Sequence, residues 1–566
     1  MDNYKNRWSE LATNWLRDYG LIILVYLLAT WFTNPWLMGD TVDYADSVLA
    51  YEHGRFLQFW EFGHLFWRPL GWFIYRILNP LTSVLFGADE RAKVTFTLVS
   101  INWVAGLACL LLLRALITRV CNRPWIINLV TIALLFSSAF LDYGQTGSAY
   151  VPGLALALGS GLILVRDREQ GHKLINAVLA GMILALAVCF WFPFVLLVPA
   201  ALSLPLFLFG WHKRQLHAVL SAGVVSGLVT LIAYAFVVHM LKINNLENLK
   251  EWVTAASHDM NQMRGVPRMV FGFANSLIDL SGEGALFKRY LKHDPFNPVS
   301  VSGLFRFSLW KLVFAYFFLF CMLLNLLRTE RGRRIIGLLV VDLLPTVIFA
   351  LFIFEAGDMS RYIAVLPLIF LAVAYSLCSD RAIPWTRYVI ILFIAVSIVT
   401  NVRAMSASTL NQREQRVEAR IKDLIPLLKP ESRVVTSHLQ DEINNFTRDF
   451  LFNPINRNGN LRYYPVVALN TTQSDHWPSH FASVATDVWG RGGDLWLSKR
   501  LLTPRPRPEW SWVEGDDPRI SWTDLYNFFS QLEVGQSVGG DDGFVLLVPS
   551  ERNKEILSRV AQDAKP

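Results

Sequence analysis

Eleven apolar stretches, each of the length that crosses a lipid bilayer, constrain this chain more than any other feature of its sequence. A transmembrane helix needs about 20 predominantly apolar residues. The stretches lie at 21–38, 94–113, 125–141, 149–165, 174–191, 194–210, 216–240, 307–327, 335–354, 362–378 and 386–401. Because a lipid-exposed backbone must satisfy its own hydrogen bonds, we expect an all-α polytopic membrane protein with about eleven transmembrane helices.

The composition agrees with a membrane protein that carries a soluble part. Hydrophobic residues make up 53% of the 566 residues and charged residues only 17%, a balance that is unusual for soluble globular domains. The net charge of +7 comes from Lys and Arg in short clusters between the apolar stretches. Because these clusters form no basic stripe with interleaved aromatic residues, we expect no nucleic acid partner.

The five cysteines are predicted to be small core residues. The sequence contains no C-x-x-C motif, and every cysteine lies in or beside an apolar stretch: Cys109, Cys121, Cys189, Cys321 and Cys378. The sequence therefore indicates neither a disulfide framework nor a zinc site.

Lys and Arg in the short loops predict the orientation, because loops that stay in the cytoplasm are enriched in these residues. If the N-terminus is cytoplasmic, the short inner segments carry 17 Lys and Arg residues, and the short outer loops carry only Arg361. Residues 1–20 are polar and lack a cleavage pattern, so the first stretch is expected to be a retained signal anchor.

This orientation divides the chain into two predicted domains. Residues 1–403 form the transmembrane module, with long outer loops at 39–93 and 241–306. Residues 404–566 contain the strand-like segments RVVTSH, YYPVVALN and GFVLLVPS, and a helical pattern that begins near Ser521 and ends before Gly535. We expect a small α/β domain on the outer side of the membrane.

The first outer loop also contains amphipathic aromatic segments. Such residues are typical of a helix that lies in the membrane interface. The residues expected at that interface are Trp60, Trp67, Trp72 and Tyr75.

Three aspartates follow the first apolar stretch in the segment "LMGDTVDYADSVLAYEHG". Asp40, Asp43 and Asp46 recur at every third position, which in a helix places them near one face. A carboxylate at the outer mouth of a span can act as a general base, orient an acceptor hydroxyl or bind a metal. The alternative for Asp40 is an ordinary solvated helix start, where Asp is common.

The residues downstream resemble a known family. In "HLFWRPLGWFIYRI", His64 begins an H-x-x-x-x-P-L segment, and "FGADERAK" contains F-G-x-x-E before the next apolar stretch. With Asp40 just after the first span, this pattern resembles the first outer loop of GT-C glycosyltransferases. These are membrane enzymes that take sugars from polyprenyl-phosphate carriers. The similarity is greatest to the bacterial branch of lipid A aminoarabinose transferases and lipopolysaccharide glycosyltransferases, with protein O-mannosyltransferases as more distant relatives.

Two further segments are similar to the same family. In "LDYGQTGSAYVPG", Asp142 matches an acid of the second outer loop, and Tyr150 matches the aromatic residue that opens the next span. In "EAGDMSRYIAVLP", Arg361 and Tyr362 enter a late span as they do in the family. The chain departs from the family at "GDTVD", where an acid is often adjacent to the first aspartate. The second acid is therefore either Asp43 or missing.

The resemblance implies an inverting glycosyltransferase with a polyprenyl-phosphate-linked sugar as donor and a periplasmic lipid, glycan or protein as acceptor. Asp40 would be the catalytic base, and Asp142 would assist it by orienting the acceptor or binding a metal. The other expected site residues are Arg68 and Arg361, which would hold the donor phosphate, and Asp43, His64, Tyr362 and Glu355, which would line the site. Two of these roles have alternatives: Asp142 as a cap of the following helix, and Arg361 in an ion pair with Glu355 or Asp358.

No cofactor is expected with certainty, although a divalent metal is possible in this reading. The sequence contains neither a G-x-x-x-x-G-K-[ST] phosphate loop nor an H-E-x-x-H zinc pair. The resemblance implies a bacterial inner membrane, with the C-terminal domain in the periplasm. Two other classes stay open at this point: a membrane transporter and a non-catalytic scaffold of an envelope assembly.

Overall fold

The computed structural model describes residues 19–33, 39–54, 59–87, 89–170, 173–255, 265–280, 285–353, 356–406, 423–429, 431–437, 466–469, 477–508, 510, 512–515 and 519–563. The chain divides into two compact units, and each is described by itself. The first comprises Met1–Leu280 and Lys311–Ser406, and the second comprises Ser281–Trp310 and Ala407–Pro566.

Apolar helices occupy all eleven positions at which the sequence predicts a span. Within the described residues, seven are long and apolar enough to cross a membrane: Glu90–Ile117, Tyr150–Glu169, Phe192–Phe209, Lys213–Met240, Val301–Leu327, Glu330–Phe352 and Pro384–Ala404. Shorter apolar helices lie at the other positions: Tyr19–Phe32, Pro124–Leu135, Leu174–Phe190 and Leu366–Cys378. The prediction of an all-α polytopic membrane protein is confirmed.

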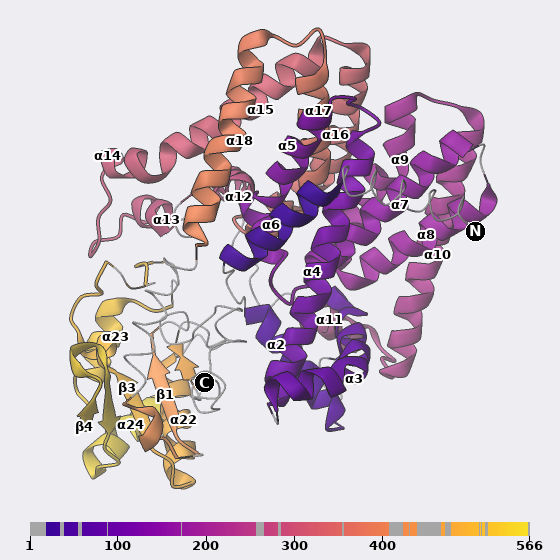
Figure 1. Ribbon diagram of the computed structural model, residues 1–566. Coiled ribbons are helices and arrows are strands. Elements are labelled where there is room, and N and C mark those ends of the chain that lie inside the picture. The colour runs from indigo at the N-terminus through magenta and orange to yellow at the C-terminus, as the bar shows by residue number, and fades with distance from the viewer. Residues whose placement is uncertain are drawn as a thin grey trace. The chain divides into compact units, whose positions relative to one another are not determined.

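Figure 1 labels the helices of the membrane part along the chain. They are α2 (Gly39–Glu52), η1 (Phe62–His64), α3 (Trp67–Phe86), α4 (Glu90–Ile117), α5 (Pro124–Leu135), α6 (Ser138–Tyr143), α7 (Tyr150–Gln170), α8 (Leu174–Phe190), η2 (Phe192–Leu196), α9 (Val198–Phe209), α10 (Lys213–Met240), α11 (Leu246–Ala255), α12 (Val266–Leu277), α15 (Trp310–Leu327), α16 (Glu330–Phe352), η4 (Met359–Tyr362), α17 (Leu366–Cys378) and α18 (Pro384–Ala404).

Local sequence signals explain where several of these helices begin. The side chain of Asp89 accepts a hydrogen bond from the backbone N–H of Ala92 and so caps α4. Thr329 caps α16 in the same way. Pro124 and Pro384 lie in the first turns of α5 and α18, where a missing N–H costs nothing.

The predicted span at 125–141 is divided into two helices. α5 ends at Leu135, and α6 begins at Ser138 as a short separate helix. The freed carbonyl of Phe136 accepts a hydrogen bond from the Asn401 side chain at 2.7 Å. Because this break redirects the chain, α6 carries Asp142 as a separate element instead of as the end of a span.

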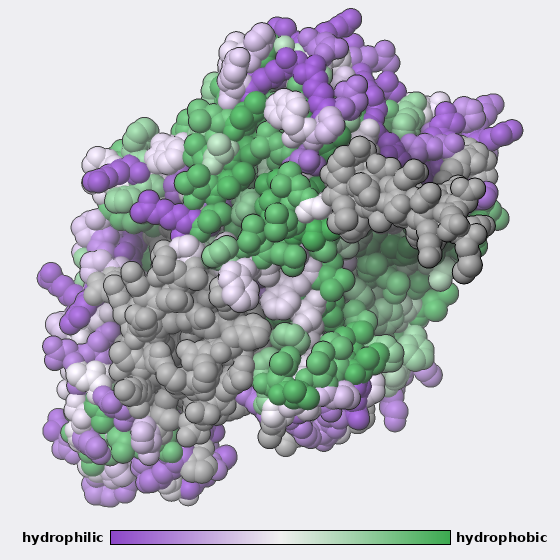
Figure 2. Space-filling view, in the orientation of Figure 1, coloured by the Kyte–Doolittle hydropathy of each residue, from purple (hydrophilic) through white to green (hydrophobic). Residues whose placement is uncertain are grey.

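Large apolar side chains remain exposed on the sides of the membrane helices, as a lipid-facing surface requires. On α10 they include Leu220, Leu228, Leu231, Ile232 and Phe236. Figure 2 shows hydrophobic residues gathered over the helix sides and hydrophilic residues near helix ends.

The aromatic residues expected at the membrane interface pack against the protein, and the position of α3 in that interface stays a prediction. Trp67 and Tyr75 are buried on the inner side of α3, and Trp72 donates a hydrogen bond to Glu52. The exposed side of α3 is instead an aliphatic and phenylalanine stripe of Phe73, Ile77, Leu81 and Val84. The helix has two apolar faces, and the sequence pattern did not distinguish them.

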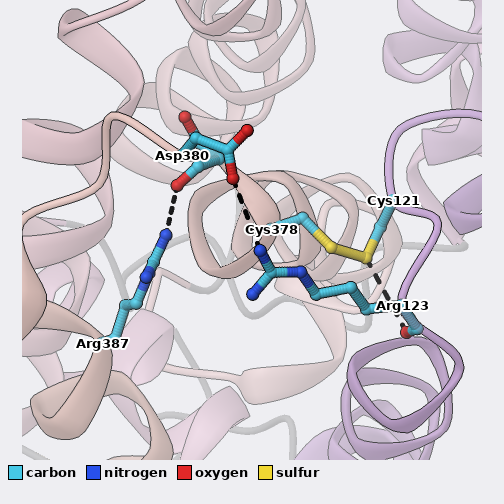
Figure 3. The surroundings of a disulfide bond; sticks show 6 residues. Cys121, Arg123, Cys378, Asp380 and Arg387 are labelled. Carbon is cyan, nitrogen blue, oxygen red and sulfur yellow. Dashed lines mark hydrogen bonds and ion pairs between the residues drawn. A yellow bond between two sulfur atoms is a disulfide. The ribbon is translucent and has the colours of Figure 1, made fainter.

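A disulfide between Cys121 and Cys378 overturns the expectation that all five cysteines are unpaired core residues. It joins the turn after α4 to the end of α17, and the ion pair between Arg123 and Asp380 lies beside it (Figure 3). The two cysteines are 257 residues apart in sequence, so no local pattern could have paired them. Cys109, Cys189 and Cys321 are buried and free, as expected.

The second unit contains a five-stranded sheet in its described residues, with the order β2-β1-β3-β5-β4. The strands are β1 (Arg433–Thr436), β2 (Val466–Ala468), β3 (Leu495–Ser498), β4 (Val534–Val538) and β5 (Phe544–Leu547). β1 is parallel to β2 and β3, whereas β5 is antiparallel to β3 and β4. Its helices are α13 (Ala285–Leu291), α14 (Val301–Leu304), η3 (Phe305–Leu309), η5 (Ile425–Leu427), α22 (Trp477–Gly490), η8 (Lys499–Leu502), α23 (Trp522–Phe529), η9 (Gly540–Asp542) and α24 (Glu551–Asp563).

The predicted α/β character of this unit is confirmed, with two strands that the sequence did not predict. The three predicted strand segments contain β1, β2 and β5, and Ser521 caps α23. α23 ends at Phe529, so Gly535 lies in β4 and does not follow the helix directly. β4 is exposed and polar, and it lacks the apolar alternation by which strands are recognised.

Buried contacts explain why residues 281–310 belong to the second unit. The guanidinium of Arg289 donates to the backbone oxygen of Trp510 at 3.0 Å, and Phe296 packs against the apolar core that contains Leu497 and Trp522. A buried guanidinium is costly without partners, so these hydrogen bonds attach the segment to the domain.

Candidate active site

Asp40 and Tyr150 meet at one end of the helix bundle. Asp40 lies in the first turn of α2, and Tyr150 is the first residue of α7. The Tyr150 hydroxyl donates to Asp40 Oδ2 at 2.9 Å. Asp40 is half-buried and Tyr150 is buried, so the carboxylate is fixed on one side and accessible on the other.

Hydrogen bonds attach the loop before α7 to α2, α3 and α4. The Thr41 hydroxyl accepts a hydrogen bond from the Gly147 backbone N–H at 3.0 Å, and Trp67 donates to the Gly147 carbonyl at 3.0 Å. Asn102 donates to the Ser148 carbonyl at 2.7 Å. A side chain at Gly147 would lie 2.6 Å from the Thr41 methyl group. The small residue therefore permits the close approach that brings Tyr150 to Asp40.

Asp142 is fully buried inside α6. It lies before the loop that precedes α7, so it is not the N-cap of that helix, and the capping alternative is wrong. Burial raises the pKa of the neighbouring Tyr143 well above its usual range, and the charges of Asp358, Asp142 and Asp40 act in the same direction. Of these three carboxylates, that of Asp358 accepts a hydrogen bond from the Tyr143 hydroxyl.

Asp358 joins α6 to the segment that carries Arg361. Its carboxylate accepts hydrogen bonds from the Tyr143 hydroxyl at 3.2 Å, from the Ser360 backbone at 2.8 Å and from the Ser360 hydroxyl at 2.7 Å. An Arg361 Nη2 lies 3.9 Å from the same carboxylate. The ion pair with Asp358 that the sequence left open therefore exists, although at a long distance. Glu355, the other predicted partner and site residue, lies outside the described residues.

Arg361 lies over the ring of Trp191, with 5.6 Å between the guanidinium carbon and the ring centroid. Trp191 in turn contacts the edge of the Tyr150 ring at a centroid distance of 4.5 Å. Arg361 and Asp40 are therefore connected through two packed aromatic rings. Trp191 was not among the predicted site residues. Its position at the end of the apolar stretch 174–191 is the sequence signal that could have indicated it.

Arg68 and His64 belong to a neighbouring buried network. Arg68 forms an ion pair with Glu61 and lies over the Tyr44 ring at 4.8 Å. The Tyr44 hydroxyl is 2.9 Å from His64 Nε2, and His64 Nδ1 is 3.2 Å from the Phe190 carbonyl oxygen. Because a carbonyl only accepts, neutral His64 donates from Nδ1 and accepts from Tyr44 at Nε2. Both ring nitrogens are engaged, and Arg68 is already paired with a carboxylate.

The other predicted site residues lie at the margin of this cluster. Asp43 is exposed on α2, and Asp46 forms an ion pair with Arg91 at 2.5 Å. Burial raises the pKa of Asp46, and the Arg91 charge opposes that shift. Tyr362 is fully buried, and its hydroxyl donates to the Ala356 carbonyl at 2.7 Å.

A divalent metal was left possible by the sequence. In the part of the chain that the structure describes, no group of three or more His, Cys, Asp or Glu side chains is arranged to hold an ion. The metal therefore stays a possibility without an assigned ligand set.

A small apolar pocket lies between helices of the bundle. It is lined by Leu154 and Gly161 of α7, Ala200 and Leu204 of α9, and Ala364 and Leu368 near α17. Leu154 is one helical turn from Tyr150 along α7, and Ala364 follows Arg361 closely in sequence. The pocket therefore lies about one helical turn from Tyr150 along α7.

The sequence matches no protein-family model and no curated protein. The fold, in contrast, is similar to solved structures. ArnT from Cupriavidus metallidurans in the apo state covers 96% of this chain and 99% of its own length, at a TM-score of 0.51 and 12% identity. The chain has the GT-C fold. The fold that the resemblance of the outer loops implied is therefore confirmed.

Two further structures with this fold show weaker similarity. ArnT from the same organism bound to undecaprenyl phosphate has a TM-score of 0.49 and 13% identity, and covers 94% of this chain and 99% of its own. The Archaeoglobus fulgidus oligosaccharyltransferase in the apo form has a TM-score of 0.44 and 10% identity, and covers 95% of this chain and 75% of its own.

Proposed function

We propose that this protein is an inverting glycosyltransferase. It transfers a sugar from a polyprenyl-phosphate carrier to a hydroxyl group of a lipid, glycan or protein acceptor. The observation that carries the proposal is the position of Asp40, which is held by Tyr150 and connected to Arg361 through the rings of Tyr150 and Trp191. The GT-C fold shared with apo ArnT, a protein that has also been solved with undecaprenyl phosphate, agrees with it.

The cluster contains the groups that such a reaction needs. The free side of the Asp40 carboxylate accepts the proton of the acceptor hydroxyl as that oxygen attacks the anomeric carbon. The bond between this carbon and the phosphate oxygen breaks, and polyprenyl phosphate leaves with the electron pair. Direct attack inverts the anomeric configuration. The exposed apolar sides of the helices offer a surface for the prenyl chain.

Of the two predicted phosphate ligands, Arg361 is favoured over Arg68. A guanidinium binds phosphate through charge-assisted hydrogen bonds. Arg68 would have to leave Glu61 to do so. Arg361 is 3.9 Å from Asp358 and lies over the ring of Trp191, which contacts Tyr150, the partner of Asp40. Asp142 is fully buried in α6, so it is proposed to support the site through its position beside Tyr143 and not to touch the acceptor.

The proposed location is the bacterial inner membrane, with Asp40 and the C-terminal domain on the periplasmic side. The basic loops at the opposite helix ends support this orientation. The proposal also implies that the acceptor approaches from the periplasm.

The decisive experiment is turnover by purified protein in lipid nanodiscs. Wild type, Asp40→Asn and the control Asp43→Asn are each given a panel of polyprenyl-phosphate sugars and candidate acceptors, and released polyprenyl phosphate is measured. Removing a general base lowers turnover by about 10²- to 10⁴-fold, so we expect this loss in Asp40→Asn and little change at exposed Asp43. Absence of release by folded wild type with every pair, or full activity of Asp40→Asn, would overturn the proposal.

One observation favours the second candidate, a transporter. Asp342 is a fully buried acid within α16, and intramembrane acids often mark transport pathways. Substrate flux into sealed vesicles that depends on Asp342 but not on Asp40 would select this class.

A further inference from the structure

We infer that Tyr150 is a positioning residue that holds the Asp40 carboxylate for proton transfer and connects it to the donor-phosphate ligand Arg361. This inference rests on the proposed glycosyltransferase function. Tyr150 is neither the acid nor the base of this reaction, because its phenol neither gains nor loses a proton in the transfer.

The contact between the two side chains is direct and specific. The Tyr150 hydroxyl donates to Asp40 Oδ2 at 2.9 Å, and 4% of Tyr150 is exposed. Among the described residues, no hydrogen bond engages the other oxygen, Oδ1. A hydrogen bond to an ionised acceptor in a water-poor site is about twice as strong as a neutral one. The carboxylate therefore has one occupied oxygen and one oxygen that can face an acceptor.

The Tyr150 ring is held on two sides, so its hydroxyl has little freedom to follow a moving carboxylate. The Tyr143 ring contacts it edge-on at a centroid distance of 5.0 Å, and the Trp191 ring at 4.5 Å. One turn further along α7, a Cβ at Gly153 would lie 2.4 Å from the ring of Phe194. The start of α7 is thus pressed against η2, which follows Trp191 in the chain.

The Tyr150 ring also connects Asp40 to Arg361, by way of Trp191. Trp191 lies between the Tyr150 ring and the Arg361 guanidinium. Arg361 is also near Asp358, to which Tyr143 donates. Tyr150 therefore occupies the position from which the distance between base and phosphate ligand is set. A displacement of about 1 Å between these two groups lowers the rate by up to about 10²-fold.

Tyr150→Phe tests this role, because it removes one hydroxyl and leaves the ring packing in place. Tyr26→Phe is the matched control: Tyr26 is also buried, and its hydroxyl donates to the Trp103 carbonyl at 2.7 Å, in a helix that contributes nothing to the site. In nanodiscs we expect Tyr150→Phe to lower kcat roughly 10- to 100-fold with donor KM unchanged. The two variants should have similar Tm values, and Tyr26→Phe should keep the wild-type kcat.

A second measurement does not depend on turnover. Carbodiimide labelling of Asp40, followed by mass spectrometry, should be faster in Tyr150→Phe than in wild type and Tyr26→Phe, because the carboxylate has lost its restraint. Equal labelling rates in all three proteins, or a kcat of Tyr150→Phe within twofold of wild type, would overturn the inference. A wild type that is inactive with every donor would instead overturn the proposed function, and the labelling result would still decide the role of Tyr150.

Discussion

At the scale of single residues, the three aspartates of the first outer loop are distinguished by what each carboxylate contacts. Asp40 accepts a hydrogen bond from Tyr150, Asp46 pairs with Arg91, and Asp43 is exposed. Their equal spacing predicts that they share a helix, which α2 confirms. The partners come from α4 and α7, which the spacing does not contain. The contacts of the three aspartates therefore differ, although their spacing in the sequence is the same.

His64 should make stability depend on pH. Burial lowers the pKa of His64 below its ordinary value of 6.5; the Arg68 charge acts in the same direction, whereas Glu61 and Asp40 oppose it. Below that value the unfolded chain binds more protons at this site than the folded protein, so the free energy of unfolding falls as pH drops through it. We expect His64→Gln to reduce the difference in Tm between about pH 7.5 and about pH 5.5.

The control for this prediction is His480→Gln, because His480 is exposed. His480→Gln should keep the wild-type pH dependence of Tm. If both variants have the same pH dependence as wild type, His64 does not contribute to it.

Asp342 should reduce the stability of the helix bundle. It is fully buried in α16, and neither of its carboxyl oxygens has a hydrogen-bond partner among the described residues. Removing an unsatisfied buried polar group recovers about 1–3 kcal/mol, so Asp342→Leu should raise the free energy of unfolding by that amount. Denaturation in nanodiscs or mild detergent measures it.

Asn325 provides the contrast. It is equally buried, but its amide donates to Ser376 at 2.9 Å and accepts from the Ile383 backbone at 3.0 Å. Asn325→Leu should therefore destabilise the protein. A loss of stability in Asp342→Leu, similar to that in Asn325→Leu, would show that the buried acid has a partner or a function.

At the scale of elements, the site depends on how short segments are placed by long helices. α6 and η4 are too short to be stable alone, and the hydrogen bond from Tyr143 to Asp358 joins them. α2 is held by the loop around Gly147, and α7 is held by its contact with η2. The residues of the proposed site therefore lie on α2, α6 and η4 and at the start of α7, and tertiary contacts fix their positions.

Gly153→Ala tests the contact between α7 and η2. The added Cβ would lie 2.4 Å from Phe194, so the two elements must separate. Overpacking of this kind costs about 1–3 kcal/mol, and turnover should fall because Tyr150 and Trp191 move apart. Gly159→Ala on the same helix is the control: its Cβ meets nothing closer than 4.0 Å, and helix propensity favours it by about 1 kcal/mol. Equal stability of the two variants would contradict the close packing.

At the scale of the whole molecule, the sequence predicts that the acids of the site and the basic loops lie at opposite ends of the membrane helices. All five native cysteines are either buried or paired in the disulfide. Cysteines introduced at exposed positions will therefore report orientation with little background.

We expect Asp43→Cys to react with a membrane-impermeant maleimide in intact cells whose outer membrane is permeable to it. Arg333→Cys, in the basic first turn of α16, should react only after lysis, because segments rich in Lys and Arg at helix ends stay in the cytoplasm. Both positions are exposed. Labelling in the reverse order would show that the bundle is inverted and would place the proposed site in the cytoplasm.

The sequence by itself determined the eleven apolar helices and the α/β character of the C-terminal unit, and it predicts the side on which the acids gather. These properties are local: they follow from the length of apolar stretches, from loop charge and from turn residues. The tertiary structure alone decided that Tyr150 holds Asp40 and that Tyr143 meets Asp358, because these bonds join residues 110 and 215 positions apart. It also paired Cys121 with Cys378 and turned the aromatic face of α3 inward. Contacts of that range depend on how helices pack, and packing is a property of the whole chain.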